Sequence, residues 1–356
     1  MRFAAAPVYE VFPTREKPLK PYVAAVRASA STREVIRSFD PEVVVADIIT
    51  SAASLAAQAE GRRWATLVPH VMPTGEAGFP IYSIGAVYPR TALGRRFWGF
   101  VRPLVMTGEE QGRVELNGAR ERVGLPPLTE VHGGISRDLA IVATFPQLEY
   151  PRPGGWPGMR VTGPLMWEQP FGDVELPPGD TPIVLVAPST SQDPEQRLVR
   201  AALEGLAGER VRVLATINRR PPSTPISVPA NASLVDWVSY ARTMPLCDAV
   251  VCHAGHGTVV RALASGVPVV ACGHAGDQAE NAARVRWAGV GVSLPRRFQT
   301  AGGLRLAVRR LLADDRYRRR AEELRDWAAA NDGAAAAADA VEELAKRAIR
   351  GAPRFI

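Results

Sequence analysis

The chain has 356 residues, of which 46% are hydrophobic and 22% are charged, and its formal net charge is +7 at pH 7. This length supports two domains with full cores, and the composition excludes a disordered or fibrous protein. Most of the basic residues are arginines. Their densest run, residues 316–320, is broken by a tyrosine and followed by two glutamates, which is typical of a solvated helix face. We therefore expect no nucleic-acid partner.

Cysteine content and hydropathy indicate the compartment. Cys247, Cys252 and Cys272 lie in or near apolar segments and are odd in number, which indicates reduced thiols rather than a disulfide framework. The sequence shows no signal-peptide pattern and no apolar run of about eighteen residues. We therefore expect a cytoplasmic protein without an integral membrane segment.

Helix and strand patterns alternate through the first half of the chain. Residues 1–6 have the pattern of a strand end, and apolar spacing predicts a helix over 22–39. The valine-rich segment 42–46 is typical of a strand in a parallel sheet covered on both faces. The remaining predicted elements are helices at 51–60 and 109–123 and strands at 64–69, 139–145 and 160–164. This alternation predicts a doubly wound α/β domain.

Two segments have a different composition. Residues 69–103 are rich in proline, glycine and aromatic side chains and are too long for a simple connection, which indicates a functional loop region. Residues 168–181 contain prolines, glycines and acids with little apolar periodicity, so we predict a linker there. The chain is therefore divided into an N-terminal domain, 1–167, and a C-terminal domain, 182–356.

The second half repeats the alternation and predicts a second doubly wound unit. Its first strand, 183–187, is followed by Ser189 and Thr190, where the chain leaves the sheet. The predicted strands that follow are 211–217, 233–237, 249–252, 267–271 and 290–294. The predicted helices are 194–206, 258–264, one ending at 283–287, and 304–350 with a break at 331–333.

The most informative stretch runs from residue 249 to residue 281. A short apolar strand ends at His253, and Gly255 and Gly257 follow before a helix that we expect to begin at Thr258. Glycines allow the backbone to approach a ligand closely, and the unpaired N–H groups and dipole of a helix N-terminus favour negative charge. The stretch therefore predicts an anion site, and a diphosphate would fit it.

The same stretch resembles the donor-binding signature of GT-B glycosyltransferases that use UDP- or dTDP-sugars to modify small molecules. The pattern stands here as His253-Ala254-Gly255-His256-Gly257-Thr258, then Gly266-Val267-Pro268, Asp277-Gln278 and Asn281. A lone glycine turn does not require this spacing. The resemblance implies an α/β GT-B fold, with two Rossmann-like doubly wound domains facing a cleft. One departure is Arg261, because the family often has a ribose-binding glutamate at that position.

The resemblance also implies roles in holding the nucleotide. Trp237 resembles the residue whose ring stacks on the pyrimidine, with Val238 offering backbone hydrogen bonds; a buried core tryptophan is the alternative. Ser189 and Thr190 resemble hydroxyl residues that contact the phosphates together with His253.

Three further residues are candidates for contact with the donor. Asp277 and Gln278 resemble the pair that binds the hydroxyls of the donor sugar, since each buried hydroxyl needs a partner. Asp277 is also suited to cap a helix. For His256, contact with a phosphate and simple filling of space remain equal alternatives.

Catalysis in inverting members of this family needs a base that takes the proton of the acceptor hydroxyl. The resemblance implies a histidine after the first strand, oriented by an aspartate after a later strand, and Asp47 stands where that aspartate is found. No histidine precedes His70. By the family pattern, a first strand–loop–helix unit is lacking. We weigh three explanations: a recorded start that is too late, a truncated protein that does not catalyse, or another base such as His70 or Asp47.

From this we expect an inverting glycosyltransferase that moves a sugar from a UDP- or dTDP-sugar to a hydroxyl of a small hydrophobic natural product or lipid. No Asp-x-Asp motif is present, so we expect a metal-independent reaction without a further cofactor. The alternatives are a catalytically inactive nucleotide-sugar-binding accessory protein and another GT-B enzyme such as an epimerase. The sugar, the acceptor and the oligomeric state stay open.

Overall fold

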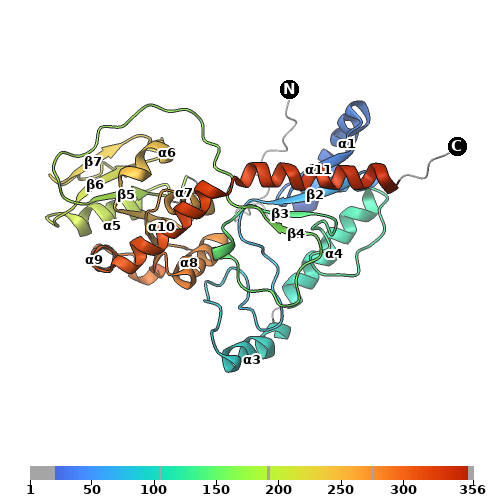
Figure 1. The fold of residues 1–356 in the computed structure, drawn as a ribbon, viewed down its shortest axis with the longest axis horizontal. Helices are drawn as coiled ribbons and strands as arrows, with labels where there is room; N and C mark the ends of the chain where they lie inside the picture. Colours follow the sequence, from blue (N-terminus) through green and yellow to red (C-terminus); the bar gives the residue numbers. More distant parts are fainter. Residues whose placement is uncertain (1–20, 105, 191–192, 275, 352–356) are drawn as a thin grey trace.

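The computed structural model describes residues 21–104, 106–190, 193–274 and 276–351 and contains two parallel sheets (Figure 1). The first sheet has its strands in chain order: β1 (Val43–Asp47), β2 (Arg63–Val68), β3 (Ala140–Val142) and β4 (Met159–Val161). The second has the order β7-β6-β5-β8-β9-β10, formed by β5 (Ile183–Ala187), β6 (Arg212–Thr216), β7 (Ala232–Val235), β8 (Ala249–Cys252), β9 (Val269–Ala271) and β10 (Gly291–Ser293).

The strand order of the second sheet reverses between β5 and β8. The chain first winds outward through β6 and β7, then returns to pair β8 with β5 and continues through β9 and β10. This is the doubly wound arrangement predicted for the second half, and ligands in such sheets bind beyond the carboxyl ends of the strands at the reversal. In the first sheet the described strands run in chain order, so the reversal predicted for the first half is not among them.

The buried strands divide their side chains between two cores. In β5, Leu185 faces one core and Val184 and Val186 face the other. Val250 and Val251 of β8 alternate in the same way, as the period of two in a strand requires. A sheet that is apolar on both faces needs helices on both sides.

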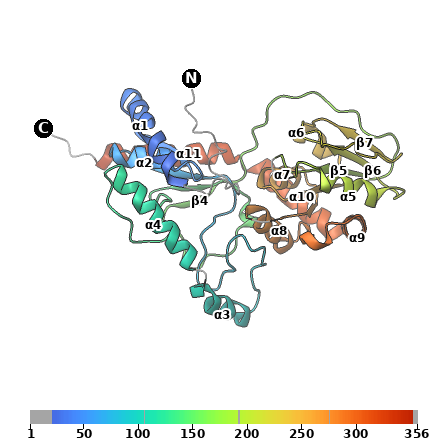
Figure 2. The same cartoon turned by 180° about the vertical axis from the view of Figure 1, so that it is seen from behind.

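Helices cover both faces of the second sheet (Figures 1 and 2). One face carries α7 (His256–Ala264), α8 (Asp277–Ala288) and α10 (Asp315–Ala330). The opposite face carries α5 (Arg197–Leu206) and α9 (Ala301–Ala313). The short helix α6 (Tyr240–Thr243) follows β7.

The first domain contains α1 (Pro21–Phe39), α2 (Ser51–Ala59), α3 (Ala92–Val101) and α4 (Met106–Arg122). The last helix, α11 (Gly333–Gly351), extends from the second domain across the first sheet (Figure 1). Ala340 and Leu344 of this helix pack against Ala65 and Ile141. The two sheets thus lie on either side of residues 168–181, but the last helix of the segment 182–356 packs on the first sheet.

Three element predictions need correction. The segment 304–350 was predicted to break once, yet Asp314 also interrupts it, because its carboxylate accepts the backbone N–H of Arg316 and caps α10. Helix α3 lies within the segment predicted as a loop. Helix α7 begins at His256 rather than at Thr258. The strand predicted at residues 1–6 lies outside the described residues.

A buried cluster of charges joins the two domains. Arg284 of α8 donates to the Leu148 carbonyl at 2.9 Å and to the Glu280 carboxylate at 2.8 Å. Its guanidinium carbon lies 3.3 Å from the ring centroid of Tyr150, and its Nη1 lies 3.6 Å from Oε2 of Glu149. Since Glu149 also accepts the N–H of Met72 at 2.6 Å, this cluster fixes the first-domain loops against α8.

Candidate functional site

The site is built where β8 ends, beside the carboxyl end of β5. His253 directly follows β8, and its Nδ1 lies 3.4 Å from the carbonyl of Ala187, the last residue of β5. The imidazole is therefore held at the reversal of strand order. Burial lowers the pKa of His253. The hydrogen bond to Ala187 and the charge of Asp277 raise this pKa in part, and His274 lowers it further.

Gly255 is required by the imidazole itself. A Cβ atom at this position would lie 2.3 Å from Nε2 of His253, although the backbone φ of −61° is open to any residue. The ring therefore lies directly over the residue that precedes the first turn of α7. Because the first N–H groups of a helix have no partner within it, an anion here meets both the ring edge and the helix N-terminus.

The start of α8 is held against the start of α7 by Asn281. Its Nδ2 donates to the carbonyl of Ala254 at 3.0 Å, where the backbone is left-handed with φ +63°. Asp277 is the first residue of α8 and is exposed, whereas Gln278 is buried. The predicted sugar-binding pair thus begins a helix that is tied to the turn after His253, and Asp277 is close enough to raise the pKa of that imidazole.

His256 lies between the two domains. Its Nδ1 is 3.4 Å from Oδ1 of Asn281 and its Nε2 is 3.3 Å from the carbonyl of Ala143, which follows β3. Complete burial lowers its pKa to about 4, with a further lowering by His70. Both ring nitrogens face protein oxygens, so the geometry favours the space-filling alternative over contact with a phosphate.

The remaining predicted phosphate contacts lie around the same helix start. Ser189 is buried after β5, and Thr190 beside it is exposed. Thr258 is buried, while Gly257 is exposed. These residues surround the junction of β5, β8 and α7, which agrees with the predicted grouping.

Trp237 is only half-buried, which argues against the core alternative. The guanidinium carbon of Arg219 lies 5.0 Å from the Trp237 ring centroid and 5.4 Å from that of Phe171, so the arginine lies next to both rings. Val238 is buried in the core between α7 and the sheet. The ring predicted to stack on a pyrimidine is thus accompanied by a cation and a linker phenylalanine, which the sequence did not reveal.

Arg261, the departure from the family pattern, has a structural role. It donates to the carbonyl of Trp167 at 2.6 Å and lies 3.7 Å from the Glu168 carboxylate. Glu168 in turn accepts the N–H groups of Tyr240 and Ala241 at the start of α6. The arginine therefore ties the linker to the residues that follow Trp237.

The segment 69–103 reaches the start of α8. The N–H of Ser83 donates to the Glu280 carboxylate at 3.3 Å, and a Cβ at Gly85 would lie 3.3 Å from the carbonyl of Ala279. The pKa of the Tyr82 hydroxyl is raised, mainly by burial and then by Glu280 and Asp277. The predicted functional loop thus lies beside the predicted sugar-binding residues.

Asp47 ends β1 at the carboxyl edge of the first sheet. Its Oδ1 accepts the N–H of Ile49 at 2.8 Å, and its carbonyl accepts the N–H of Thr50 at 3.0 Å. These are the contacts of a turn residue, and within the described ranges no imidazole is hydrogen-bonded to the carboxylate. Its role as an orienting residue stays a prediction.

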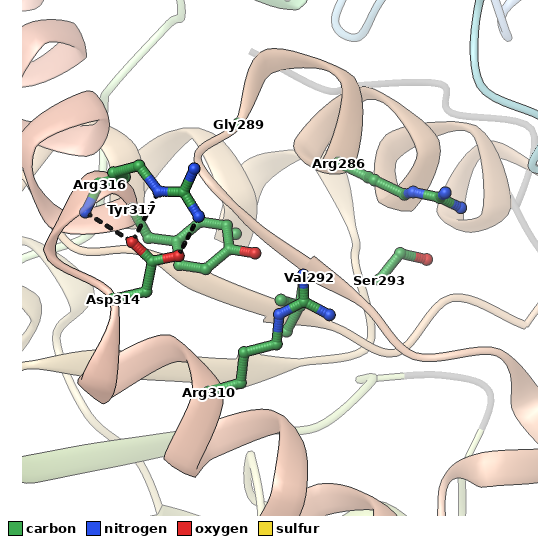
Figure 3. Close-up of a pocket in the computed structure, with 9 residues that line it drawn as sticks. Arg286, Gly289, Val292, Ser293, Arg310, Asp314, Arg316 and Tyr317 are labelled. Atoms are coloured by element: carbon green, nitrogen blue, oxygen red, sulfur yellow. Dashed lines mark hydrogen bonds and ion pairs between the residues drawn. The ribbon is translucent and has the colours of Figure 1, made fainter.

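Other features of the described residues lie apart from this site. They contain no group of three or more histidines, cysteines or carboxylates suited to a metal ion, and none of their helices is long and apolar enough to span a membrane. A hollow of about 490 Å³ lies beside β10, where Arg286, Arg310 and the Arg316–Asp314 ion pair line it (Figure 3). None of the predicted donor residues lines that hollow, so it is not the anion site at α7.

Comparisons with known proteins agree with this geometry. Residues 201–344 match the family described as "Erythromycin biosynthesis protein CIII-like, C-terminal domain". A solved glycosyltransferase of kitacinnamycin superposes with a TM-score of 0.74 over 94% of this chain and 84% of its own, at 21% identity. The chain has the fold of the GT-B glycosyltransferases.

Two further proteins define the extent of the likeness. The 4'-demethylrebeccamycin synthase of Lentzea aerocolonigenes is 35% identical over 236 residues, which are 63% of this chain and 55% of that relative. The chain thus spans about half the length of this relative. The structure of the glycosyltransferase VinC in complex with dTDP has a TM-score of 0.60 at 19% identity, over 92% of this chain and 80% of that one.

Proposed function

We propose that the protein transfers a sugar from a UDP- or dTDP-sugar to a hydroxyl of a small hydrophobic acceptor, with inversion at the anomeric carbon. The observation that carries this proposal is the position of His253 over Gly255 at the N-terminus of α7, with Asp277 nearby. The imidazole and the helix N-terminus favour the leaving diphosphate, and the carboxylate is suited to the sugar hydroxyls.

The comparisons support a donor of this class. The solved VinC structure contains dTDP, and the relative from Lentzea aerocolonigenes is a natural-product synthase by its name. We propose that charge on the diphosphate is neutralised by His253 and α7 rather than by a metal ion. On this proposal, turnover continues in the presence of EDTA.

The acceptor is proposed to enter from the first domain. The loop that carries Tyr82 reaches the start of α8, where Asp277 lies, and it supplies aromatic and backbone groups there. Binding sites for small molecules typically combine apolar walls with a few polar groups in this way. A small acceptor with an apolar body and a reactive hydroxyl fits this description.

A turnover assay with UDP- and dTDP-sugars and hydroxylated aromatic acceptors tests the proposal. The His253→Ala variant is expected to lose at least tenfold in kcat/KM for the donor, because it lacks a charge-assisted contact to the diphosphate. Unchanged kcat/KM would count against the donor site. Calorimetric titration with UDP and dTDP separates the enzyme from the accessory protein, since the latter binds nucleotide without turnover.

A further inference from the structure

Helix α3 exposes an apolar face to solvent. None of its residues is buried, and the side chains of Leu93, Phe97 and Phe100 are 79%, 57% and 80% exposed. These three residues are spaced by four and then three positions, so they lie on the same side of the helix. Large apolar side chains that are exposed together, rather than singly, indicate a surface that another molecule covers.

The other side of α3 rests on the protein. A Cβ atom at Gly78 would lie 3.1 Å from the Cβ of Arg95. Arg95 is two residues from Leu93 and from Phe97, which places it on the side opposite to the apolar face. The helix itself projects beyond both sheets (Figures 1 and 2). The apolar face therefore points away from the body of the molecule.

The segment that contains α3 is strongly basic. From Glu76 to Glu109 no other acidic residue occurs, and the sequence between them contains Arg90, Arg95, Arg96 and Arg102. This part of the surface therefore has a local excess of positive charge, which favours an anionic partner.

Two of these arginines border the apolar face. Arg96 lies three residues after Leu93 and four before Phe100, and Arg90 lies one helical turn before Leu93. Both are exposed, and neither forms an ion pair within the described part of the chain, whereas Arg102 lies 3.8 Å from the carboxylate of Glu109. The apolar face thus has a rim of cations that are free to contact a partner.

We propose that α3 docks on the surface of a lipid bilayer that contains anionic lipids. Leu93, Phe97 and Phe100 enter the boundary between the headgroups and the acyl chains, while Arg90 and Arg96 contact the headgroup phosphates. With ten residues the helix lies in the plane of the interface and does not span the membrane. The inference goes beyond the proposed function and does not depend on it, because its test measures binding to vesicles rather than sugar transfer.

The charge of the rim argues against a second copy of the chain as the partner. A two-fold contact places the same patch of both subunits face to face, so two copies of α3 would bring their arginines together. Like charges at an interface are unfavourable, whereas lipid phosphates neutralise them. A bilayer is therefore the better match to this face.

Co-sedimentation with vesicles tests the apolar face. The vesicles consist of phosphatidylcholine alone or of equal parts of phosphatidylcholine and phosphatidylglycerol. The unaltered protein is expected to bind the mixed vesicles at least about tenfold more tightly than the neutral ones, and the double variant Phe97→Ser/Phe100→Ser to lose at least about tenfold of that affinity. Leu306→Ser is the matched control, since Leu306 is 66% exposed on α9 and its loss is expected to change nothing.

A second pair of variants tests the rim. Arg90→Gln/Arg96→Gln is expected to weaken binding to the mixed vesicles at least about threefold. Arg305→Gln/Arg310→Gln removes the same charge from exposed positions on α9 and is expected to keep the affinity of the unaltered protein.

A label on α3 reports contact directly, even if one of these variants folds poorly. All three cysteines of the chain are buried, so an introduced cysteine can be labelled selectively. An environment-sensitive dye on Phe100→Cys is expected to shift its emission to shorter wavelength with mixed vesicles, because it moves from water into the interface. The same dye on Leu306→Cys is expected to show no shift.

Four results would overturn the proposal. The first is no binding of the unaltered protein to the mixed vesicles, and the second is equal affinity in Phe97→Ser/Phe100→Ser. The third is an equal loss in the two arginine pairs, which would mean that only the net charge matters. The fourth is a dimer in gel filtration that the double serine variant makes monomeric, because a second copy then covers the face.

Discussion

The contact between His253 and Gly255 makes a sharp test at the scale of single residues. In Gly255→Ala the new methyl group would lie 2.3 Å from Nε2 of His253, so the imidazole has to leave its position. We expect nucleotide affinity to fall about tenfold or more, the effect of losing a charge-assisted contact of about 1.4 kcal/mol. Isothermal titration with dTDP and UDP measures it.

The control for this substitution is Gly118→Ala in α4. A Cβ at Gly118 meets nothing within 4 Å, and alanine is the better helix former by about 1 kcal/mol. Nucleotide affinity is expected to be unchanged in this variant. Equal affinities in Gly255→Ala and in the unaltered protein would show that the imidazole does not contact the ligand.

The protonation of His253 gives a second residue-scale prediction. Burial lowers its pKa and outweighs the opposing hydrogen bond to the Ala187 carbonyl, so the free protein holds a neutral ring at pH 7. A bound diphosphate favours the charged ring, and binding therefore takes up a proton. Affinity is expected to fall as the pH rises above neutrality. Calorimetry in buffers of different ionisation enthalpy measures the uptake, which His253→Ala should abolish.

The residues of this site differ in how far the sequence could predict them. The grouping of His253, Gly255 and Asp277 follows from local spacing, because a strand, a turn and a helix N-terminus bring them together. The positions of His256 and Arg261 depend on partners far along the chain, the carbonyls of Ala143 and Trp167. No local pattern encodes such contacts, so the sequence left His256 undecided and gave Arg261 no role.

At the scale of elements, the turn after β8 depends on α8. Asn281→Leu removes the amide that donates to the buried carbonyl of Ala254, where the backbone is left-handed. An unsatisfied buried carbonyl costs about 1–3 kcal/mol, so we expect the free energy of unfolding to fall by that amount. Urea denaturation measures it. A loss below about 0.5 kcal/mol would show that the turn is held by other contacts.

The predicted ends of strands and helices alike differ from the observed ones by up to three residues, but strands β5 and β8 have the predicted bounds. The buried strand 183–187 was predicted with the bounds of β5, because a continuous apolar run between polar residues leaves little choice. Helix α3 was missed because Pro89, Gly94 and Gly99 lie in or beside it and obscure its pattern. The break at Asp314 was missed because a capping aspartate between two helices resembles an ordinary exposed helix residue.

At the scale of the whole molecule, Arg284 couples the domains. In Arg284→Met the Glu280 carboxylate stays buried without its cation and Glu149 keeps only Arg152, at 3.7 Å, which together costs about 3–5 kcal/mol. We expect a lower melting temperature and, in calorimetry, a split of the unfolding peak, because the first-domain loops lose their contact with α8.

Arg316→Met is the control for that variant. Arg316 pairs with Asp314 on the surface, where an ion pair contributes about 0–1 kcal/mol. Its melting temperature is expected to stay close to that of the unaltered protein. If Arg284→Met melts in a single peak at the normal temperature, the cluster does not join the domains.

The arrangement of two sheets could be predicted from the alternation of elements and from the resemblance at residues 253–281. The path of α11 could not, since its alanine-rich sequence fits either sheet and only the packing of Ala340 and Leu344 on the first sheet decides its place. The buried charge cluster could not be predicted either, because Glu149 and Arg284 are distant in the chain. Glutamate and arginine are residue types that usually lie on the surface.

The central claim is that a nucleotide diphosphate binds at His253 and the N-terminus of α7. The most direct measurement is calorimetric titration of dTDP and UDP into the unaltered protein and into His253→Ala at pH 7. The account predicts that at least one nucleotide binds the unaltered protein with one site and that the substitution weakens this affinity at least tenfold. Equal affinity in the two proteins, or binding of neither nucleotide to the unaltered protein, would contradict it.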